Sequence, residues 1–136
     1  MVVGSRLHGQ VEKGAMSWTH LLGNRIFNTM INLLNHSDIS DSQSGFRAIA
    51  RGAFMNLRLS SKGFEIETEM TVQALRNGLR VRGVPITYRG RRGPSSKPSG
   101  SGAGMSIFKT ILRCSLTNRS REKKNVWAFL ARATKS

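Results

Sequence analysis

The sequence predicts an α/β domain, in which helices pack against a sheet. Residues 19–34 and 63–77 carry apolar side chains at the three-and-four spacing of an amphipathic helix. Residues 80–88 have a partly alternating apolar pattern, which is typical of a strand, and the apolar opening of the chain indicates the end of a buried strand. Helices that alternate with strand-like segments favour an α/β layer over an all-helical bundle.

The first predicted helix is followed by a polar loop. We expect Asn28 and Asn32 to lie largely away from the apolar face of the helix. Residues 36–45 are rich in short polar side chains that bond to their own backbone, so they predict a loop, and residues 47–57 form a weaker helical stretch. The predicted apolar face consists of Leu22, Ile26, Phe27, Met30, Ile31, Leu33 and Leu34.

The second predicted helix ends at a glycine and leads into the strand. Gly78 can supply the left-handed residue that closes a helix. Pro85 cannot donate a hydrogen bond within a sheet, so it predicts an edge position or a strand end for residues 80–88. The side chains expected to face the core are Phe64, Met70, Ala74 and Leu75.

The remainder of the chain is basic. Glycine, proline, serine and cations predict a flexible basic loop at 89–104, and an apolar stripe predicts an amphipathic helix at 105–117. Residues 118–136 form a basic tail with a small apolar patch, which could be disordered or could seek a membrane surface.

Composition limits the function classes. A chain of 136 residues with a net charge of +15 can form one small domain and favours phosphate-rich partners, such as nucleic acid, anionic membrane or a phosphorylated substrate. Cys114 is the single cysteine, so we expect it to act as a small apolar residue in a reducing compartment. The sequence contains no long apolar run that would span a membrane and no signal peptide, and its opening indicates a chain that begins partway through a fold.

Several motifs, taken in order, resemble the C-terminal half of family 2 glycosyltransferases of the dolichyl-phosphate mannosyltransferase type. The most specific is Asp-x-x-Ser-Gly-Phe-Arg at 41–47, followed by a glutamate-bearing helix and by Val-Pro-Ile-Thr-Tyr at 84–88. The others are Val-Val-Gly-Ser-Arg at 2–6, Glu-Lys-Gly-Ala-Met at 12–16 with Trp18, Gly-Asn-Arg at 23–25, and the Arg-rich loop that ends in Ser96 and Lys97.

The resemblance implies that residues 1–117 form the C-terminal part of a GT-A domain, with a mixed sheet flanked by helices. In such enzymes a Rossmann-like N-terminal half carries an Asp-x-Asp motif for Mg or Mn and the nucleotide diphosphate. This chain lacks that motif, so the resemblance implies no cofactor site here and a possible separate N-terminal half. It also implies inverting hexose transfer from a nucleotide sugar to polyprenyl phosphate, by an enzyme peripheral to the cytoplasmic face of a membrane.

The resemblance also implies roles for particular residues. Asp41 would orient or deprotonate the acceptor, although it could instead cap a helix that begins near Phe46. Ser44 and Gly45 could present backbone N–H groups to phosphate at that helix start, or form an ordinary turn. Glu69 would face the acceptor cleft, although a solvated acidic face is the more common meaning of its cluster.

Arginines with planar guanidinium groups are the predicted phosphate ligands. Arg6 is the main candidate for the lipid phosphate and Arg25 the second, whereas Arg47 is expected to form a structural pair with a glutamate. The loop residues expected to close over phosphate are Arg89, Arg91, Arg92 and Lys97.

Two other function classes compete with a transferase. The +15 charge could serve a basic nucleic-acid-binding protein, but aromatic residues are sparse and no recognition motif is present, which argues against it. A degenerate, non-catalytic remnant of the enzyme is the third interpretation.

Overall fold

The computed structural model describes residues 1–12, 14–90 and 102–117, and it confirms the predicted α/β class. The predicted tail and most of the predicted basic loop lie outside these residues. The elements in chain order are β1 (Val2–Ser5), α1 (Trp18–Asn35), β2 (Arg47–Ala48), α2 (Arg51–Met55), α3 (Ile66–Arg76), β3 (Arg82–Pro85) and α4 (Gly102–Thr117).

The described strands form a mixed sheet with the order β2-β1-β3. β1 runs antiparallel to β2 and parallel to β3, with Val3 opposite Arg47 on one side and opposite Gly83 on the other. The C-terminal ends of β1 and β3 and the start of β2 therefore meet at one end of the sheet. Pro85 lies in β3, on the edge of this sheet, as its missing N–H predicts.

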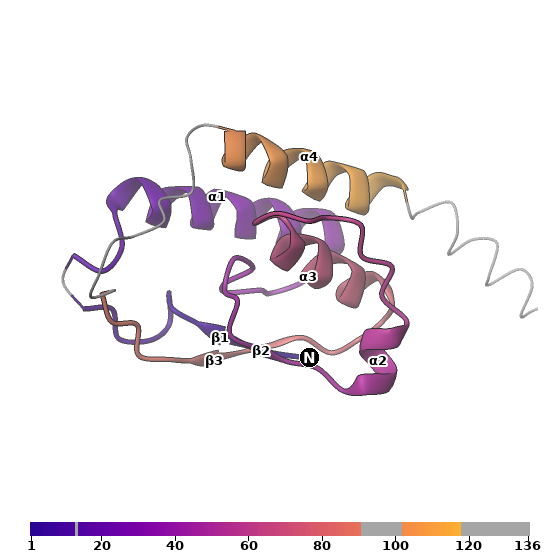
Figure 1. Ribbon diagram of the computed structural model, residues 1–136, viewed down its shortest axis with the longest axis horizontal. Helices are drawn as coiled ribbons and strands as arrows, with labels where there is room; N and C mark the ends of the chain where they lie inside the picture. The colour runs from indigo at the N-terminus through magenta and orange to yellow at the C-terminus, as the bar shows by residue number, and fades with distance from the viewer. Residues whose placement is uncertain (13, 91–101, 118–136) are drawn as a thin grey trace, which may run out of the picture.

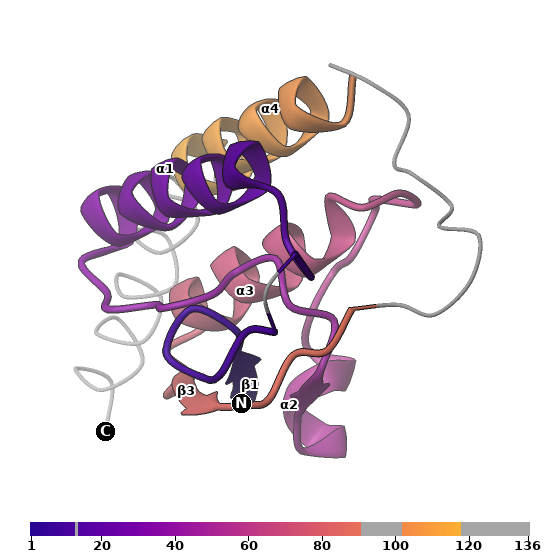
Figure 2. The ribbon, with the colours of Figure 1, turned by 90° about the vertical axis from the view of Figure 1, so that its left-hand side faces the viewer.

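Helices cover one face of the sheet in two layers. Figure 1 places α1, α3 and α4 on the same side of the strands, and Figure 2 shows α1 and α4 side by side, with α3 between them and the sheet. The core lies between these three helices and includes Ile31, Val72 and Ile111, each with 0% of its surface exposed. The helices therefore form the support on which the loops at the end of the sheet are held.

The helices predicted at residues 19–34 and 63–77 are confirmed as α1 and α3, and local backbone contacts determine where they end. α1 begins after Ser17, whose hydroxyl accepts a hydrogen bond from the His20 N–H, and it ends at His36 in a left-handed conformation. Gly78 follows α3 with a φ of +72°, so it is the predicted left-handed residue.

The predicted helix at 47–57 is largely wrong. Arg47 and Ala48 form β2, and only Arg51–Met55 is helical. The N–H of Gly4 donates to the carbonyl of Phe46 at 2.7 Å, which draws this segment against β1. Pairing with a strand distant in sequence overrides the weak local helical preference.

The faces of the helices also differ in part from prediction. Asn28 is 6% exposed and faces the interior of the molecule, whereas Leu22, Ile26 and Leu33 are 49%, 50% and 72% exposed. Phe64 was expected to face the core, but it precedes α3 and is 58% exposed. Apolar spacing identified the helices but could not identify which side of α1 would pack against polar loop backbone.

The last described helix is longer than predicted. α4 begins at Gly102 rather than at residue 105, so its first residues belong to the stretch predicted as loop. Cys114 packs against the core cluster, as expected for a small apolar residue, and burial raises the pKa of its thiol. Within the described residues, no helix combines the length and the apolar character needed to span a bilayer.

Candidate functional site

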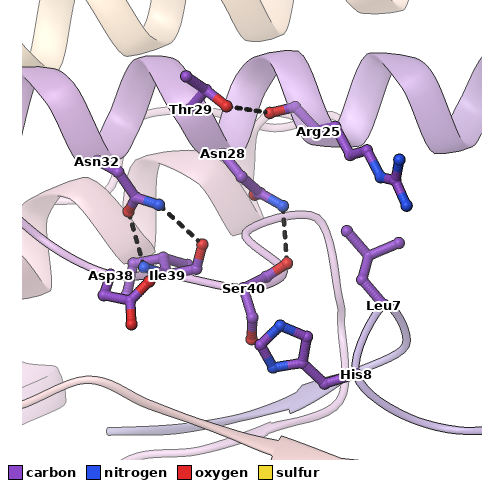
Figure 3. Close-up of a pocket in the computed structure, with 9 residues that line it drawn as sticks. All are labelled: Leu7, His8, Arg25, Asn28, Thr29, Asn32, Asp38, Ile39 and Ser40. Carbon is purple, nitrogen blue, oxygen red and sulfur yellow. Dashed lines mark hydrogen bonds between the residues drawn. The ribbon is translucent and has the colours of Figure 1, made fainter.

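The polar loop at 36–45 is held against α1 by two asparagine side chains. The Asn28 amide donates to the Ser40 carbonyl at 2.8 Å and accepts from the Ser42 N–H and hydroxyl at 2.9 and 2.6 Å. One helical turn later, Asn32 donates to the Ile39 carbonyl and accepts from the Ile39 N–H at 2.7 Å. Figure 3 shows both amides pointing from the helix toward the loop. The two amides satisfy the hydrogen-bonding requirement of backbone N–H and C=O groups in the loop, which a neighbouring strand would otherwise do.

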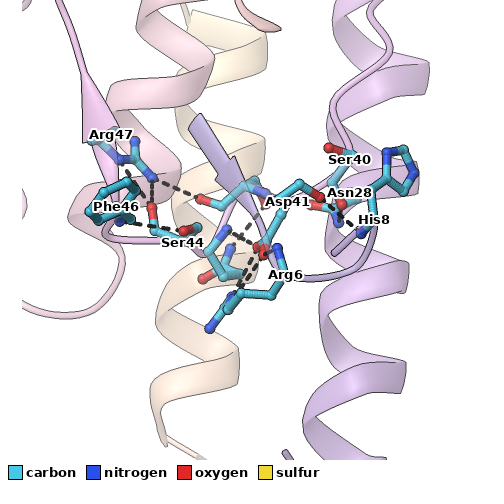
Figure 4. Close-up of polar contacts among 11 residues, drawn as sticks. Arg6, His8, Asn28, Ser40, Asp41, Ser44, Phe46 and Arg47 are labelled. Atoms are coloured by element: carbon cyan, nitrogen blue, oxygen red, sulfur yellow. Dashed lines mark hydrogen bonds and ion pairs between the residues drawn. The ribbon is translucent and has the colours of Figure 1, made fainter. Parts of the chain in front are cut away.

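This anchoring places Asp41 against the residue that follows β1. The Arg6 guanidinium donates through Nε and Nη2 to the two carboxylate oxygens of Asp41 at 2.8 and 2.9 Å, and the Arg6 backbone N–H adds a third bond at 3.0 Å. Asp41 is 1% exposed. Figure 4 shows this pair between α1 and the Ser44–Arg47 turn. The paired, two-bond geometry fixes the orientation of the guanidinium plane.

The Arg6 cation is strongly stabilised at this position. Burial by itself would lower the pKa of Arg6, but hydrogen bonding to Asp41 and its negative charge outweigh burial, so the pKa is raised. The Tyr88 ring lies 5.6 Å below the guanidinium carbon. Side-chain hydrogen bonding and electrostatic interaction with Tyr88 raise the Arg6 pKa further. The pair thus holds a cation in a fixed orientation just after β1.

On its other side the loop is clamped by Arg47. Its guanidinium donates to the carbonyls of Ser42, Ser44 and Glu67 and to the hydroxyl of Thr71. Burial lowers the pKa of Arg47, and the nearby charges of Glu67 and Asp41 oppose this. The expected structural role is confirmed, although Arg47 bonds to backbone carbonyls and not to a glutamate carboxylate. The turn is therefore fixed from both α1 and α3.

A cavity of about 340 Å³ opens beside this pair. Ser40 and Leu7, which line it, are the chain neighbours of Asp41 and Arg6. Arg25 contributes a cation from α1, and His8 lies across from it, close to Ser40 (Figure 3). The remaining lining residues are Asn28, Thr29, Asn32, Asp38 and Ile39. The charged side chains that line the cavity are Arg25 and Asp38, whereas Arg6 and Asp41 themselves are not among its lining residues.

Two predictions about the turn at Ser44 are corrected by the fold. The expected helix start near Phe46 does not exist, because Phe46 leads into β2, so neither a helix dipole at Ser44 and Gly45 nor a helix cap by Asp41 is present. The Ser44 hydroxyl is buried and accepts from the Phe46 N–H, while Gly45 is exposed. Asp41 instead accepts from Arg6 and from the Gln43 N–H.

Glu69 belongs to a separate cluster. It is 2% exposed and accepts from the N–H groups of Ser60 and Ser61 at 3.0 and 2.7 Å. Arg113 of α4 adds an ion pair at 3.3 Å. These contacts join α3, α4 and the segment before α3, and none of them connects Glu69 to Asp41. Its described role is structural.

The basic loop begins beside the Arg6–Asp41 pair. Tyr88, under Arg6, pairs with Val11, and the Gly90 N–H donates to the Glu12 carboxylate at 2.8 Å. Arg89 between them is exposed. Arg91, Arg92 and Lys97 lie outside the described residues, so their predicted phosphate binding stays a prediction.

The sequence reasoning missed the two anchoring asparagines and the aromatic support of Arg6. A usable signal existed for the first, because two asparagines spaced by one helical turn interrupt an apolar helix next to a polar loop. The packing of Tyr88 under Arg6 depends on the parallel pairing of β1 with β3 and had no local signal.

Comparison with known proteins finds glycosyltransferases. Glycosyltransferase AglJ of Haloferax volcanii is 35% identical over 124 residues, which make up 86% of this chain and 39% of that protein. The low-salt glycan biosynthesis hexosyltransferase Agl6 of the same organism is 34% identical over 73% of this chain and 24% of its own length. Polyprenol monophosphomannose synthase of Mycolicibacterium smegmatis is 35% identical over 68% of this chain and 36% of its own length. No protein-family model and no solved structure matches the chain.

The chain therefore belongs to the glycosyltransferases. The names of these relatives include a hexosyltransferase and a polyprenol monophosphomannose synthase, in agreement with the resemblance that the order of the motifs indicated. The chain spans less than half the length of each of these three relatives.

Proposed function

We propose that this chain forms the acceptor side of a glycosyltransferase that moves a hexose from a nucleotide sugar to polyprenyl phosphate. The observation that carries the proposal is the Arg6–Asp41 pair, which holds a cation in a fixed orientation at the C-terminal end of β1. Ligands of open α/β sheets bind at this end of the strands. The partial GT-A fold and the family 2 assignment form part of the same proposal.

In the proposed reaction the lipid phosphate is the nucleophile, so it needs orientation more than deprotonation. Arg6 and Arg25 bind its oxygens, and Asp41 orients the Arg6 fork. An oxygen of the phosphate attacks the anomeric carbon with inversion, and the nucleotide diphosphate leaves with the bonding electron pair. In this proposal Ser44 and Gly45 contribute the shape of the turn. The basic loop closes over the phosphates with Arg89, Arg91, Arg92 and Lys97.

The described residues do not fit a metal site. No three His, Cys, Asp or Glu side chains converge within the described part of the chain, and Arg6 occupies both oxygens of Asp41. The described residues therefore contribute no ligand set for Mg or Mn to the proposed reaction. Donor activation and transfer are proposed to require polypeptide that this chain does not supply, so the purified chain with a nucleotide sugar and polyprenyl phosphate should give no transfer.

The outer helices suit a membrane surface, where polyprenyl phosphate resides. α1 exposes Trp18, Leu22 and Ile26 at four-residue spacing, and α4 exposes Phe108 and Leu116. Lys109 and Arg113 flank the α4 stripe; exposed Lys109 can meet anionic headgroups, whereas Arg113 is paired with Glu69. We propose that these helices rest on the cytoplasmic face of a membrane, which brings the nearby Arg25 to the headgroup level.

One vesicle experiment tests both the proposed phosphate-binding site and the proposed membrane-facing surface of α1 and α4. Binding of the 136-residue chain is measured on phosphatidylcholine vesicles that contain polyprenyl phosphate, phosphatidic acid at equal charge, or uncharged polyprenol. We expect preference for polyprenyl phosphate, and Arg25→Gln should weaken that binding about tenfold because one charged hydrogen-bonding group is lost. Arg51→Gln, which removes an exposed charge on α2, is the matched control.

The same vesicles report on the helix surface. In a Trp127→Phe background, Trp18 should show a blue-shifted emission when the chain binds, because this residue is 72% exposed in the structure. Equal binding to all three vesicle types would contradict the acceptor assignment. An unshifted Trp18 spectrum on vesicles that bind the chain would contradict the membrane-facing assignment of α1.

A further inference from the structure

The acceptor site depends on a side chain that lies outside the motifs of the family resemblance. Asp41 has Ser40 and Ser42 as chain neighbours, and the Asn28 amide bonds to both of them, through the Ser40 carbonyl and the Ser42 N–H and hydroxyl. Among the described residues, no other side chain forms hydrogen bonds with both neighbours of Asp41. The chain on both sides of Asp41 is therefore held from α1, in addition to the contacts of Arg47 with the turn.

The contacts of Asn28 use both ends of its amide, the nitrogen as a donor and the oxygen as a double acceptor. Its nitrogen donates at 2.8 Å and its oxygen accepts two bonds, at 2.9 and 2.6 Å. The side chain is buried, so none of these bonds can be replaced easily by water. Asn32 makes a similar pair of bonds to Ile39 one turn later, so the two amides together hold the loop at Ile39, Ser40 and Ser42.

We infer that Asn28 is a positioning residue for the acceptor site, because it holds Asp41 in the one place from which the carboxylate can orient Arg6. This inference rests on the proposed function for its meaning in catalysis. The structural part of the inference is that the Arg6–Asp41 contact depends on Asn28. This dependence can be measured without any lipid or sugar.

The test is NMR of the full 136-residue chain with Asn28→Ala. We expect the amide protons of Ser42 and Arg6, which bond to Asn28 and Asp41, to exchange at least about tenfold faster. The Arg6 Nε–H signal should move to the position of an unpaired arginine, since its bond to Asp41 at 2.8 Å is released. A purely structural loss elsewhere in the loop would leave that Arg6 signal unchanged.

Asn24→Ala is the matched control. Asn24 lies one turn earlier on the same helix and makes no hydrogen bond through its side chain with the described residues. It should leave exchange at Ser42 and the Arg6 signal as in the unsubstituted chain. If Asn28→Ala abolishes folding, Asn28→Asp decides the question, because it keeps the acceptor for Ser42 but faces the Ser40 carbonyl with a carboxylate oxygen in place of the donor.

The inference is overturned if a folded Asn28 variant retains the Arg6 Nε–H signal and slow Arg6 amide exchange. In the vesicle assay, a folded Asn28→Ala should lose preference for polyprenyl phosphate while it still binds anionic vesicles. Absence of that preference in the unsubstituted chain contradicts the proposed function alone, since the NMR result still decides whether Asn28 positions Asp41.

Discussion

Two buried carboxylates, Asp41 and Glu69, organise the loops of this molecule. Asp41 orients the cation at the candidate site, whereas Glu69 holds the segment before α3 through Ser60 and Ser61. Burial by itself would raise the pKa of Glu69, but the hydrogen bonds from Ser61 and Ser60 outweigh it, and the pKa is lowered. A buried carboxylate with this many donors stabilises the fold as an anion.

The lowered pKa of Glu69 predicts a defined pH dependence of stability. Because the folded pKa lies below the unfolded one, the carboxylate stabilises the fold at pH values above the unfolded pKa, and this is lost as pH falls through the folded pKa. Glu69→Gln should lower the free energy of unfolding by about 1–3 kcal/mol at neutral pH. Urea unfolding followed by circular dichroism across a pH series should find that deficit shrinking in acid.

Glu65→Gln removes the same charge at the start of α3 and is the control for general electrostatics. A deficit for Glu69→Gln that is the same at every pH would show that the loss comes from packing and not from the charge of the carboxylate.

Among the elements, the strand pairing matters most for the site. The parallel contact between β1 and β3 brings the residues after each strand together, so that Tyr88 lies under Arg6. This pairing depends on close backbone approach at Gly9, where an added Cβ would lie 1.9 Å from the Ile86 carbonyl oxygen. The turn after β1 can therefore take its position only without a side chain at residue 9.

Gly9→Ala should consequently push the turn that carries Arg6 away from the segment after β3. We expect a loss of about 2 kcal/mol or more in the free energy of unfolding, because the clash is with backbone and not with a flexible side chain. Chemical unfolding gives the measurement. Gly52→Ala in α2, where nothing lies within 4 Å, should be neutral or slightly stabilising; equal effects of the two substitutions would contradict the clash.

For the whole molecule, charge is the dominant property. A net charge of +15 on 136 residues attracts any polyanion, so binding to phosphate as such does not distinguish a lipid site from a nucleic-acid site. The Arg6–Asp41 pair is different, because its geometry is fixed by two hydrogen bonds and by the clamps on the loop. Specificity should therefore appear in the headgroup preference and not in overall affinity for anions.

We accordingly predict that RNA binds the chain weakly, without base preference and with steep salt dependence. Log–log plots of affinity against salt should be linear, because the binding energy comes from counterion release. Fluorescence anisotropy with two short RNAs of contrasting base composition, at several salt concentrations, makes the measurement. A strong preference for one RNA that survives at high salt would favour the nucleic-acid-binding alternative over the transferase proposal.

The sequence by itself determined the α/β class, the positions of α1 and α3, the left-handed turn at Gly78 and the family, because apolar periodicity, glycine and ordered motifs act over short stretches of chain. Only the tertiary structure decided that residues 47–48 form a strand, that Asn28 faces inward and that Asp41 pairs with Arg6. Those outcomes depend on contacts between residues far apart in sequence, whose energies compete with local preferences and often exceed them.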